Sequence, residues 1–165
     1  MLEQARIDSL KFAREGGRLT GEVAVADMGR LHDMLFEQSG SVHYVLVGAL
    51  DERGRPTLNV EVRGTVPLLC QRCLERLDFQ LLRTAHLILV ADDAELPDVS
   101  QEALDSETIR AADLSDVSDL VEQETVLGLP LAPVHEQACS TAQSPARPQD
   151  DSPFAVLKRL RQPDA

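Results

Sequence analysis

Three cysteines and one of the four histidines are the residues of this chain best suited to chemistry. Cys70 and Cys73 form a C-x-x-C motif, and His135 and Cys139 form an H-x-x-x-C motif. Zinc takes four thiolate or imidazole ligands in a tetrahedron, and two ligands a few residues apart on one turn can supply half of them. A zinc site made by both pairs is therefore one interpretation, and it requires tertiary folding to bring the pairs together. The other interpretation is that these residues are reduced thiols and a histidine that bind no metal.

The C-x-x-C motif also admits thiol redox chemistry. Thioredoxin-like motifs place the first cysteine at the start of a helix that follows a strand, where the helix dipole lowers the thiol pKa. Here the motif lies between two predicted strands with no βαβ unit around it. The redox interpretation is therefore weaker than the zinc interpretation.

Other catalytic patterns are missing from the sequence. There is no G-x-S-x-G motif, no H-E-x-x-H motif and no phosphate-binding loop. Glu122 and Glu124 are two residues apart on a predicted helix, so they point in different directions, and we expect both on a solvated face. The sequence thus predicts a protein that is not an enzyme, with no small-molecule substrate and with zinc as the one cofactor to test.

The net charge of −12 is distributed unevenly. Residues 91–124 contain twelve acids and one base, Arg110, a balance of −11. The rest of the chain, with sixteen acids and fifteen bases, is almost neutral. A segment this acidic repels phosphate and attracts a lysine- and arginine-rich protein.

Residues 52–83 have the opposite tendency, with six arginines against four acids. Arginine makes bidentate contacts to phosphate, so one interpretation is that the arginines of this region contact the phosphate backbone of RNA. The alternative is that the arginines are surface charges paired with acids such as Glu61, Glu75 and Asp78. The six arginines are Arg53, Arg55, Arg63, Arg72, Arg76 and Arg83.

Alternating apolar and polar residues predict the strands that would position these side chains. Short connections between the strands favour an antiparallel sheet, and Gly64 is expected to mark a bulge. Helices are predicted over residues 27–37, capped by Asp27, and over residues 116–129. Residues 91–112 show no periodicity and are expected to form a loop with at most one helical turn. The strands are predicted over residues 18–26, 42–50, 58–63, 66–69 and 77–90.

The predicted fold class is α+β, mainly an antiparallel sheet with a few flanking helices and a flexible C-terminal tail. Residues 1–139 are expected to form the single domain, and residues 140–165 a flexible linker and a short terminal helix. No apolar run approaches the roughly 20 residues that span a bilayer, and the N-terminus is charged, unlike a signal peptide. An odd number of cysteines is unusual for a secreted disulfide framework. We therefore expect a cytoplasmic protein without membrane contact.

Three separated segments resemble the YceD family of bacterial and plastid proteins. Residues 66–73, VPLLCQRC, are similar to its C-x-R-C hairpin. Asp116 and residues 120–135, LVEQETVLGLPLAPVH, resemble its segment from an acidic helix to a proline-rich stretch ending in histidine. Cys139 falls where members often carry a cysteine, and residues 153–157, PFAVL, are similar to the terminal motif. Gln123 replaces a more usual acid, and Asp151-Ser152 stand where the family has asparagine.

The resemblance implies a non-catalytic factor for the synthesis, processing or stability of 23S ribosomal RNA and for assembly of the large (50S) subunit. It also implies a functional tie to large-subunit ribosomal proteins, and it brings no catalytic residues with it. Two mechanisms remain open. The protein could touch large-subunit pre-rRNA through the arginines of residues 52–83, or its acidic residues 91–124 could bind a basic ribosomal protein. The charge balance slightly favours binding of a basic ribosomal protein. A zinc-binding protein or a C-x-x-C redox protein is the alternative from a different functional class.

Overall fold

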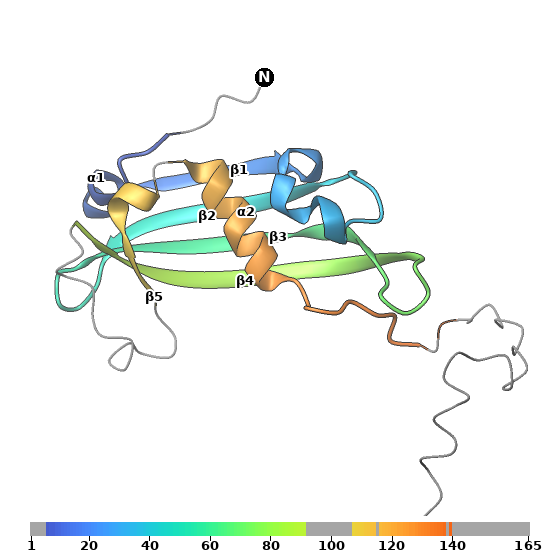
Figure 1. Cartoon of the computed structure of the whole chain (residues 1–165). Coiled ribbons are helices and arrows are strands. Elements are labelled where there is room, and N and C mark those ends of the chain that lie inside the picture. Colours follow the sequence, from blue (N-terminus) through green and yellow to red (C-terminus); the bar gives the residue numbers. More distant parts are fainter. Residues whose placement is uncertain (1–5, 92–106, 115, 138, 140–165) are drawn as a thin grey trace, which may run out of the picture. The chain divides into compact units, whose positions relative to one another are not determined.

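A five-stranded sheet organises the computed structural model, which describes residues 6–91, 107–114, 116–137 and 139. Neighbouring strands follow the chain order, and the first four are antiparallel, whereas the last is parallel to its neighbour (Figure 1). The predicted α+β class with a mainly antiparallel sheet is confirmed. The strands are β1 (Arg18–Ala24), β2 (Ser41–Leu50), β3 (Pro56–Leu69), β4 (Arg76–Val90) and β5 (Glu107–Arg110).

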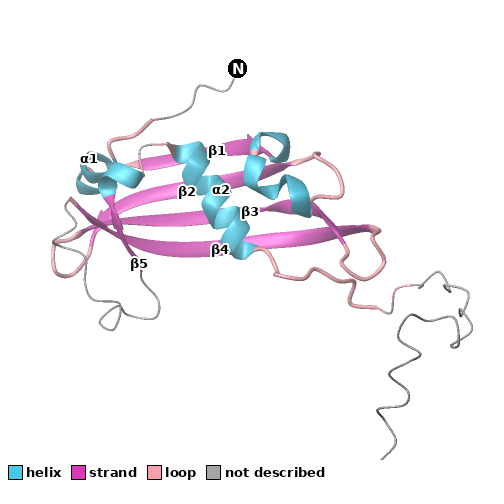
Figure 2. Cartoon of the chain, in the orientation of Figure 1, coloured by secondary structure: helices cyan, strands magenta, loops and turns pink. Residues whose placement is uncertain are grey.

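The helices lie together on one face of this sheet (Figure 2). They are α1 (Ser9–Arg14), α2 (Val117–Gly128) and the 3-10 helices η1 (Val25–Asp27), η2 (Gly29–Met34) and η5 (Ala111–Asp113). The helix predicted over residues 116–129 is confirmed, and it begins as expected because the Asp116 carboxylate accepts a hydrogen bond from the Ser118 N–H at 2.8 Å. No described helix is long and apolar enough to cross a membrane.

The core lies between the sheet and these helices. In β2 and β3, alternate side chains point toward the helices and are buried, because successive residues of a strand face opposite sides. We call this side the covered face and the other side the open face. Among the buried residues of the covered face are Val42, Leu46, Leu58, Val60, Val62, Val66 and Leu68.

The helix predicted over residues 27–37 is wrong. The segment forms η1 and η2 instead, and neither has a side-chain cap, so Asp27 does not cap a helix. Val25, Met28 and Leu31 are fully buried at intervals of three residues. Val25 lies on η1, Leu31 lies on η2, and Met28 is the non-helical residue between them, so two short 3-10 turns bring all three into the core.

Two further expectations need correction. The loop expected over residues 91–112 contains β5, a strand too short to produce a recognisable alternation, which pairs with Leu87–Val90 of β4. Gly64 marks no bulge, since β3 pairs without interruption on both sides of it. A side chain at this position would lie 2.8 Å from the Ser41 carbonyl oxygen, so the glycine permits close strand approach.

The chain divides into two compact units, Met1–Val134 and His135–Ala165, and every element named above belongs to the first. The linker and helix predicted over residues 140–165 lie outside the described residues.

Candidate functional site

Cys70 and Cys73 lie on the turn that joins β3 to β4, as the sequence predicts. Cys70 is fully buried and Cys73 is half-buried. The Cys70 N–H donates to the Glu75 carbonyl at 3.0 Å, and the Leu74 N–H donates to the Cys70 carbonyl at 2.9 Å. These bonds fold the C-x-x-C motif into a tight loop at the tip of a long hairpin (Figure 1).

Leu74 gives this turn an unusual backbone. Its φ of 61° makes it the one non-glycine residue with positive φ in the part of the chain that the structure describes. A branched side chain in this left-handed conformation costs free energy, and such outliers persist only where the surroundings impose them. Strained positions of this kind gather at ligand-binding sites.

A hydrogen bond fastens the same turn to the segment that follows α2. The Gln71 N–H, between the two cysteines, donates to the carbonyl of buried Pro133 at 2.8 Å. Pro130 and Pro133 follow the end of α2 at Gly128, as predicted, because proline cannot continue a helix. The chain therefore returns from the end of α2 to the C-x-x-C turn.

His135 and Cys139 form the second pair, in the unit His135–Ala165. The Cys139 Sγ and His135 Nδ1 atoms are 3.4 Å apart, and both residues are half-buried. None of the three cysteines is in a disulfide. Three thiols and one imidazole are a donor set that could hold a metal ion.

The arginines of residues 52–83 are largely engaged within the protein. Arg55 contacts Asp51 at 2.7 Å, and Arg83 contacts Glu124 at 2.7 Å. Arg76 pairs with Asp78 at 2.8 Å, as anticipated, and also with Glu37. At least half of the arginine cluster is thus paired with acids of the same chain.

Glu122 and Glu124 correct an expectation, because neither lies on a solvated helix face. Glu122 is 9% exposed and Glu124 is 1% exposed. The Glu122 Oε1 accepts the Arg30 N–H at 2.6 Å, while Glu124 bonds to Arg83 on β4. Both carboxylates therefore connect α2 to the rest of the fold, and the sequence contained no local sign of this because their partners are distant along the chain.

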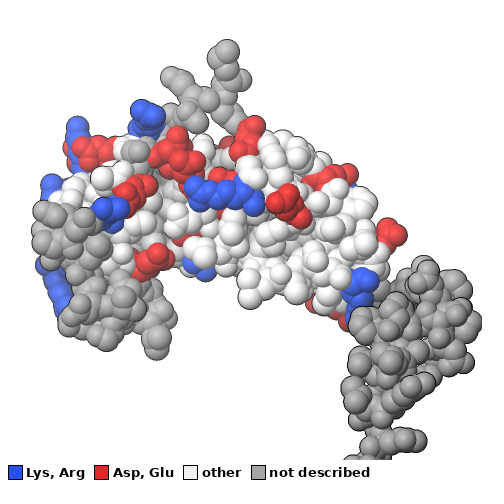
Figure 3. All heavy atoms as spheres, in the orientation of Figure 1, with Lys and Arg blue, Asp and Glu red and all other residues white. Residues whose placement is uncertain are grey.

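The acidic region, residues 91–124, contains acids that are buried or paired within the fold and acids that are exposed. Of its acids in the described residues, Glu122 and Glu124 are buried, Asp116 caps α2, and Asp113 pairs with Arg110 at 2.9 Å. Glu107 and Asp119 are exposed. Charged groups are accordingly of mixed sign on the covered side, with a broad uncharged area between them (Figure 3).

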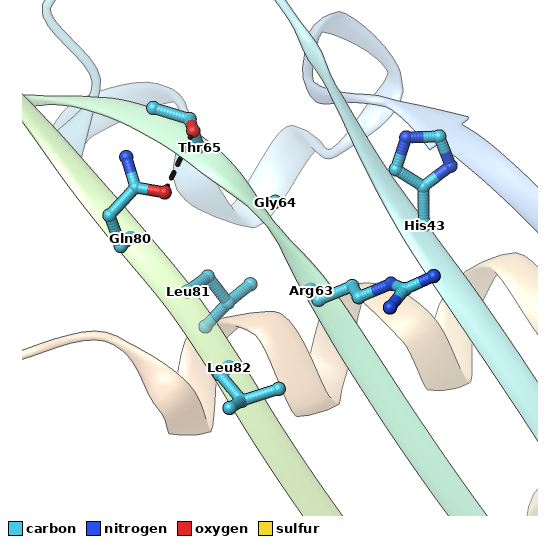
Figure 4. Close-up of a pocket in the computed structure, with 7 residues that line it drawn as sticks. All are labelled: His43, Arg63, Gly64, Thr65, Gln80, Leu81 and Leu82. Carbon is cyan, nitrogen blue, oxygen red and sulfur yellow. Dashed lines mark hydrogen bonds between the residues drawn. The ribbon is translucent and has the colours of Figure 1, made fainter.

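The open face carries a shallow hollow over β2, β3 and β4 (Figure 4). His43 and Arg63 are cross-strand neighbours there, and exposed Leu82 is paired with Arg63 on the other side. His43 Nδ1 lies 3.5 Å from a Glu22 carboxylate oxygen. Arg63 makes no ion pair with another described residue, so its guanidinium can meet an external anion.

Comparison with known protein families agrees with the three sequence segments that resemble the YceD family. No solved structure matches the chain significantly. The model of the family described as "Large ribosomal RNA subunit accumulation protein YceD" matches residues 58–161, which include most of β3, all of β4 and α2, and the three cysteines. This match covers more than half of the sequence, and the chain therefore belongs to the YceD family, whose description connects it with accumulation of the RNA of the large ribosomal subunit.

Proposed function

We propose that this chain supports accumulation of large-subunit ribosomal RNA as a non-catalytic protein whose direct partner is a basic large-subunit ribosomal protein. The observation that carries this choice is the internal pairing of Arg55, Arg76 and Arg83. A carboxylate beside a guanidinium cancels much of its positive charge at short range, which weakens the attraction of these arginines for the phosphates of RNA. The expected compartment is the cytoplasm.

The charge of the acidic region supports a basic partner. Residues 92–106 contain six acids and no base, and the neighbouring Glu107 is exposed. The negative electrostatic potential of such a segment speeds its encounter with a lysine- and arginine-rich protein and disfavours binding of RNA. Binding of this kind would protect a ribosomal protein until it reaches its RNA, so that loss of the factor would lower RNA accumulation indirectly.

Direct binding of pre-rRNA is the second candidate, and exposed Arg63 on the open face favours it. Tyr44 and Phe79 are the aromatic residues of the strands, and both pack in the core of the covered face. The open face of the strands therefore offers no phenylalanine, tyrosine or tryptophan ring for base stacking, and the imidazole of His43 is a smaller platform. RNA would be held there mainly through phosphate, with a steep salt dependence.

Thiol redox chemistry is not favoured. The C-x-x-C motif occupies a turn between two strands, so no helix dipole acts on Cys70, and this thiol is fully buried. Both features are the reverse of a reactive thiolate. Disulfide-reductase turnover that disappears in Cys70→Ser would contradict this conclusion.

The experiment is a pull-down of the tagged full chain at moderate salt, with and without ribonuclease. We expect a large-subunit ribosomal protein that stays bound after ribonuclease. Binding should weaken at least tenfold when Asp92, Asp93 and Glu95 are changed to their amides. The variant Arg53→Glu/Arg63→Glu, which instead makes the arginine region more acidic, should bind at least as well as wild type. Salt-sensitive RNA binding that this second variant abolishes, without affinity for any ribosomal protein, would establish the RNA mechanism instead.

A further inference from the structure

We propose that Cys70, Cys73, His135 and Cys139 bind one structural zinc ion. This inference is independent of the partner proposed above, because it rests on donor chemistry, the geometry of the C-x-x-C turn and chain connectivity. The zinc would hold the segment that follows Pro133 to the turn between β3 and β4.

The first two ligands come from one turn. Cys70 and Cys73 are held on a loop whose two internal backbone hydrogen bonds measure 3.0 and 2.9 Å. The left-handed conformation of Leu74 directly after Cys73 keeps this loop closed at a cost in free energy. A metal that takes both thiolates would offset that cost, whereas glycine at position 74 would be the simpler solution for a turn without a ligand.

Chain connectivity brings the third ligand near. Gln71 lies between the two cysteines, and its bond to the Pro133 carbonyl joins the turn to a residue two positions before His135. Two residues of extended chain span at most about 7 Å. His135 therefore cannot be far from the C-x-x-C turn, whatever conformation the rest of its segment takes.

The last two ligands are already adjacent to each other. The imidazole Nδ1 of His135 and the thiol of Cys139 are 3.4 Å apart, so two soft donor atoms converge within one short segment. Each half of the site is thus preassembled by local structure, and the complete set is three thiolates and one imidazole. Soft ligands of this kind select zinc over magnesium or calcium.

The chemistry is coordination without oxidation or reduction. Three thiols lose their protons to solvent, the neutral imidazole donates a lone pair, and Zn²⁺ changes the charge of the set from −3 to −1. Four protein ligands fill the tetrahedron and leave no position for water or substrate. The site would therefore stabilise structure and would not catalyse hydrolysis.

The test uses the reduced full chain, produced with a tag that contains no histidine. We expect one zinc per chain by elemental mass spectrometry after purification in buffer with trace zinc. Titration of the metal-free protein with Co²⁺ should give thiolate charge-transfer bands and the intense visible bands of tetrahedral cobalt. Cys139→Ser and Cys73→Ser should each weaken metal binding at least a hundredfold, while His43→Gln on the open face should bind as wild type does.

Two results would overturn the proposal. One is a wild-type chain that takes up no zinc or cobalt when titrated in the reduced state. The other is a Cys139→Ser variant with unchanged affinity and cobalt spectrum, because the C-x-x-C pair would then bind metal without the second pair. Cys139 lies outside the unit that contains the sheet, so circular dichroism of this variant should stay native and the result can be interpreted even if Cys73→Ser fails to fold.

Discussion

The two tight hairpin turns of the sheet solve the same geometric problem in different ways. The turn between β2 and β3 is closed by its own residues, since the Asp51 carboxylate accepts the N–H groups of Arg53 and Arg55 at 2.9 and 2.8 Å. Its left-handed position is Gly54, with φ of 77°. The turn between β3 and β4 has Leu74 at its left-handed position, and it sends the Gln71 N–H to Pro133, far along the chain.

This difference indicates what each turn is for. The first has the residues that local physical chemistry prefers: an acid that caps the loop and a glycine that tolerates positive φ. The second departs from both preferences and contains two cysteines. A turn can lack the residues that close it most stably where a ligand or a partner compensates for the lost free energy.

Removal of metal should produce the largest difference between the turns. If zinc binds as proposed, a strong chelator should lower the thermal midpoint of the wild-type chain. A ligand at a hundred times its Kd contributes about 2.7 kcal/mol, which corresponds to roughly 5–10 °C for a domain of this size. Scanning calorimetry with and without chelator measures the shift. The Cys139→Ser variant is the control, and an equal shift in that variant would exclude the proposed ligand set.

Gly54→Ala should give the next largest effect. No atom lies within 4 Å of the added methyl group, so the cost comes only from the positive φ, and we expect a loss of about 1 kcal/mol. Urea denaturation gives the value. Gly29→Ala is the matched control, since its methyl group also meets open space but its φ is not positive. Equal effects at both positions would show that backbone strain is not the cause.

Leu74→Gly should act in the opposite direction. In metal-free protein, relief of the left-handed strain should raise the free energy of unfolding by about 0.5 kcal/mol, after the added flexibility of glycine is subtracted. Leu82→Gly, at another exposed leucine in extended backbone, should instead destabilise. A destabilised Leu74→Gly variant would mean that the contacts of the leucine side chain stabilise the fold by more free energy than the left-handed backbone costs.

The smallest effect concerns pH and Asp51. The Arg55 N–H that donates to the Asp51 carboxylate, together with the Arg55 guanidinium and the Arg53 N–H, lowers the pKa of this group below its usual 3.8. Because the folded pKa is the lower one, the contribution of Asp51 to stability is complete above pH 3.8 and is lost as the pH falls through the folded value. NMR titration of the carboxyl carbon should show the lowered pKa. An Asp51→Asn variant should lack this part of the acid destabilisation, and a normal pKa would show that the turn is not held by charge.

Much of the fold follows from local patterns. The strand pattern in β1 to β4 predicts the sheet because apolar residues recur with a period of two along much of these segments. The helix from Val117 is predicted because Asp116 and the two prolines mark its ends. The hairpin position of Cys70 and Cys73 follows from these strands without further information.

The errors share one cause, which is dependence on distant residues. Glu122 and Glu124 are buried because Arg30 and Arg83 meet them, and nothing near them in the sequence indicates those partners. β5 exists because the end of β4 offers it an edge to pair with. Likewise, the three-residue spacing of Val25, Met28 and Leu31 fits both helix types until the core selects one.

The sequence by itself determined the four-strand hairpin pattern, the helix of residues 117–128 and the residue types that could bind zinc. It also determined the family, because three motifs occur in order. Tertiary structure alone decided which charges are neutralised, which glutamates are buried, and that the Gln71 N–H meets Pro133. Periodicity and capping act over a few residues and are therefore visible in the sequence. Ion pairs and long-range hydrogen bonds depend on which surfaces the folded chain brings into contact, and only the three-dimensional arrangement specifies that.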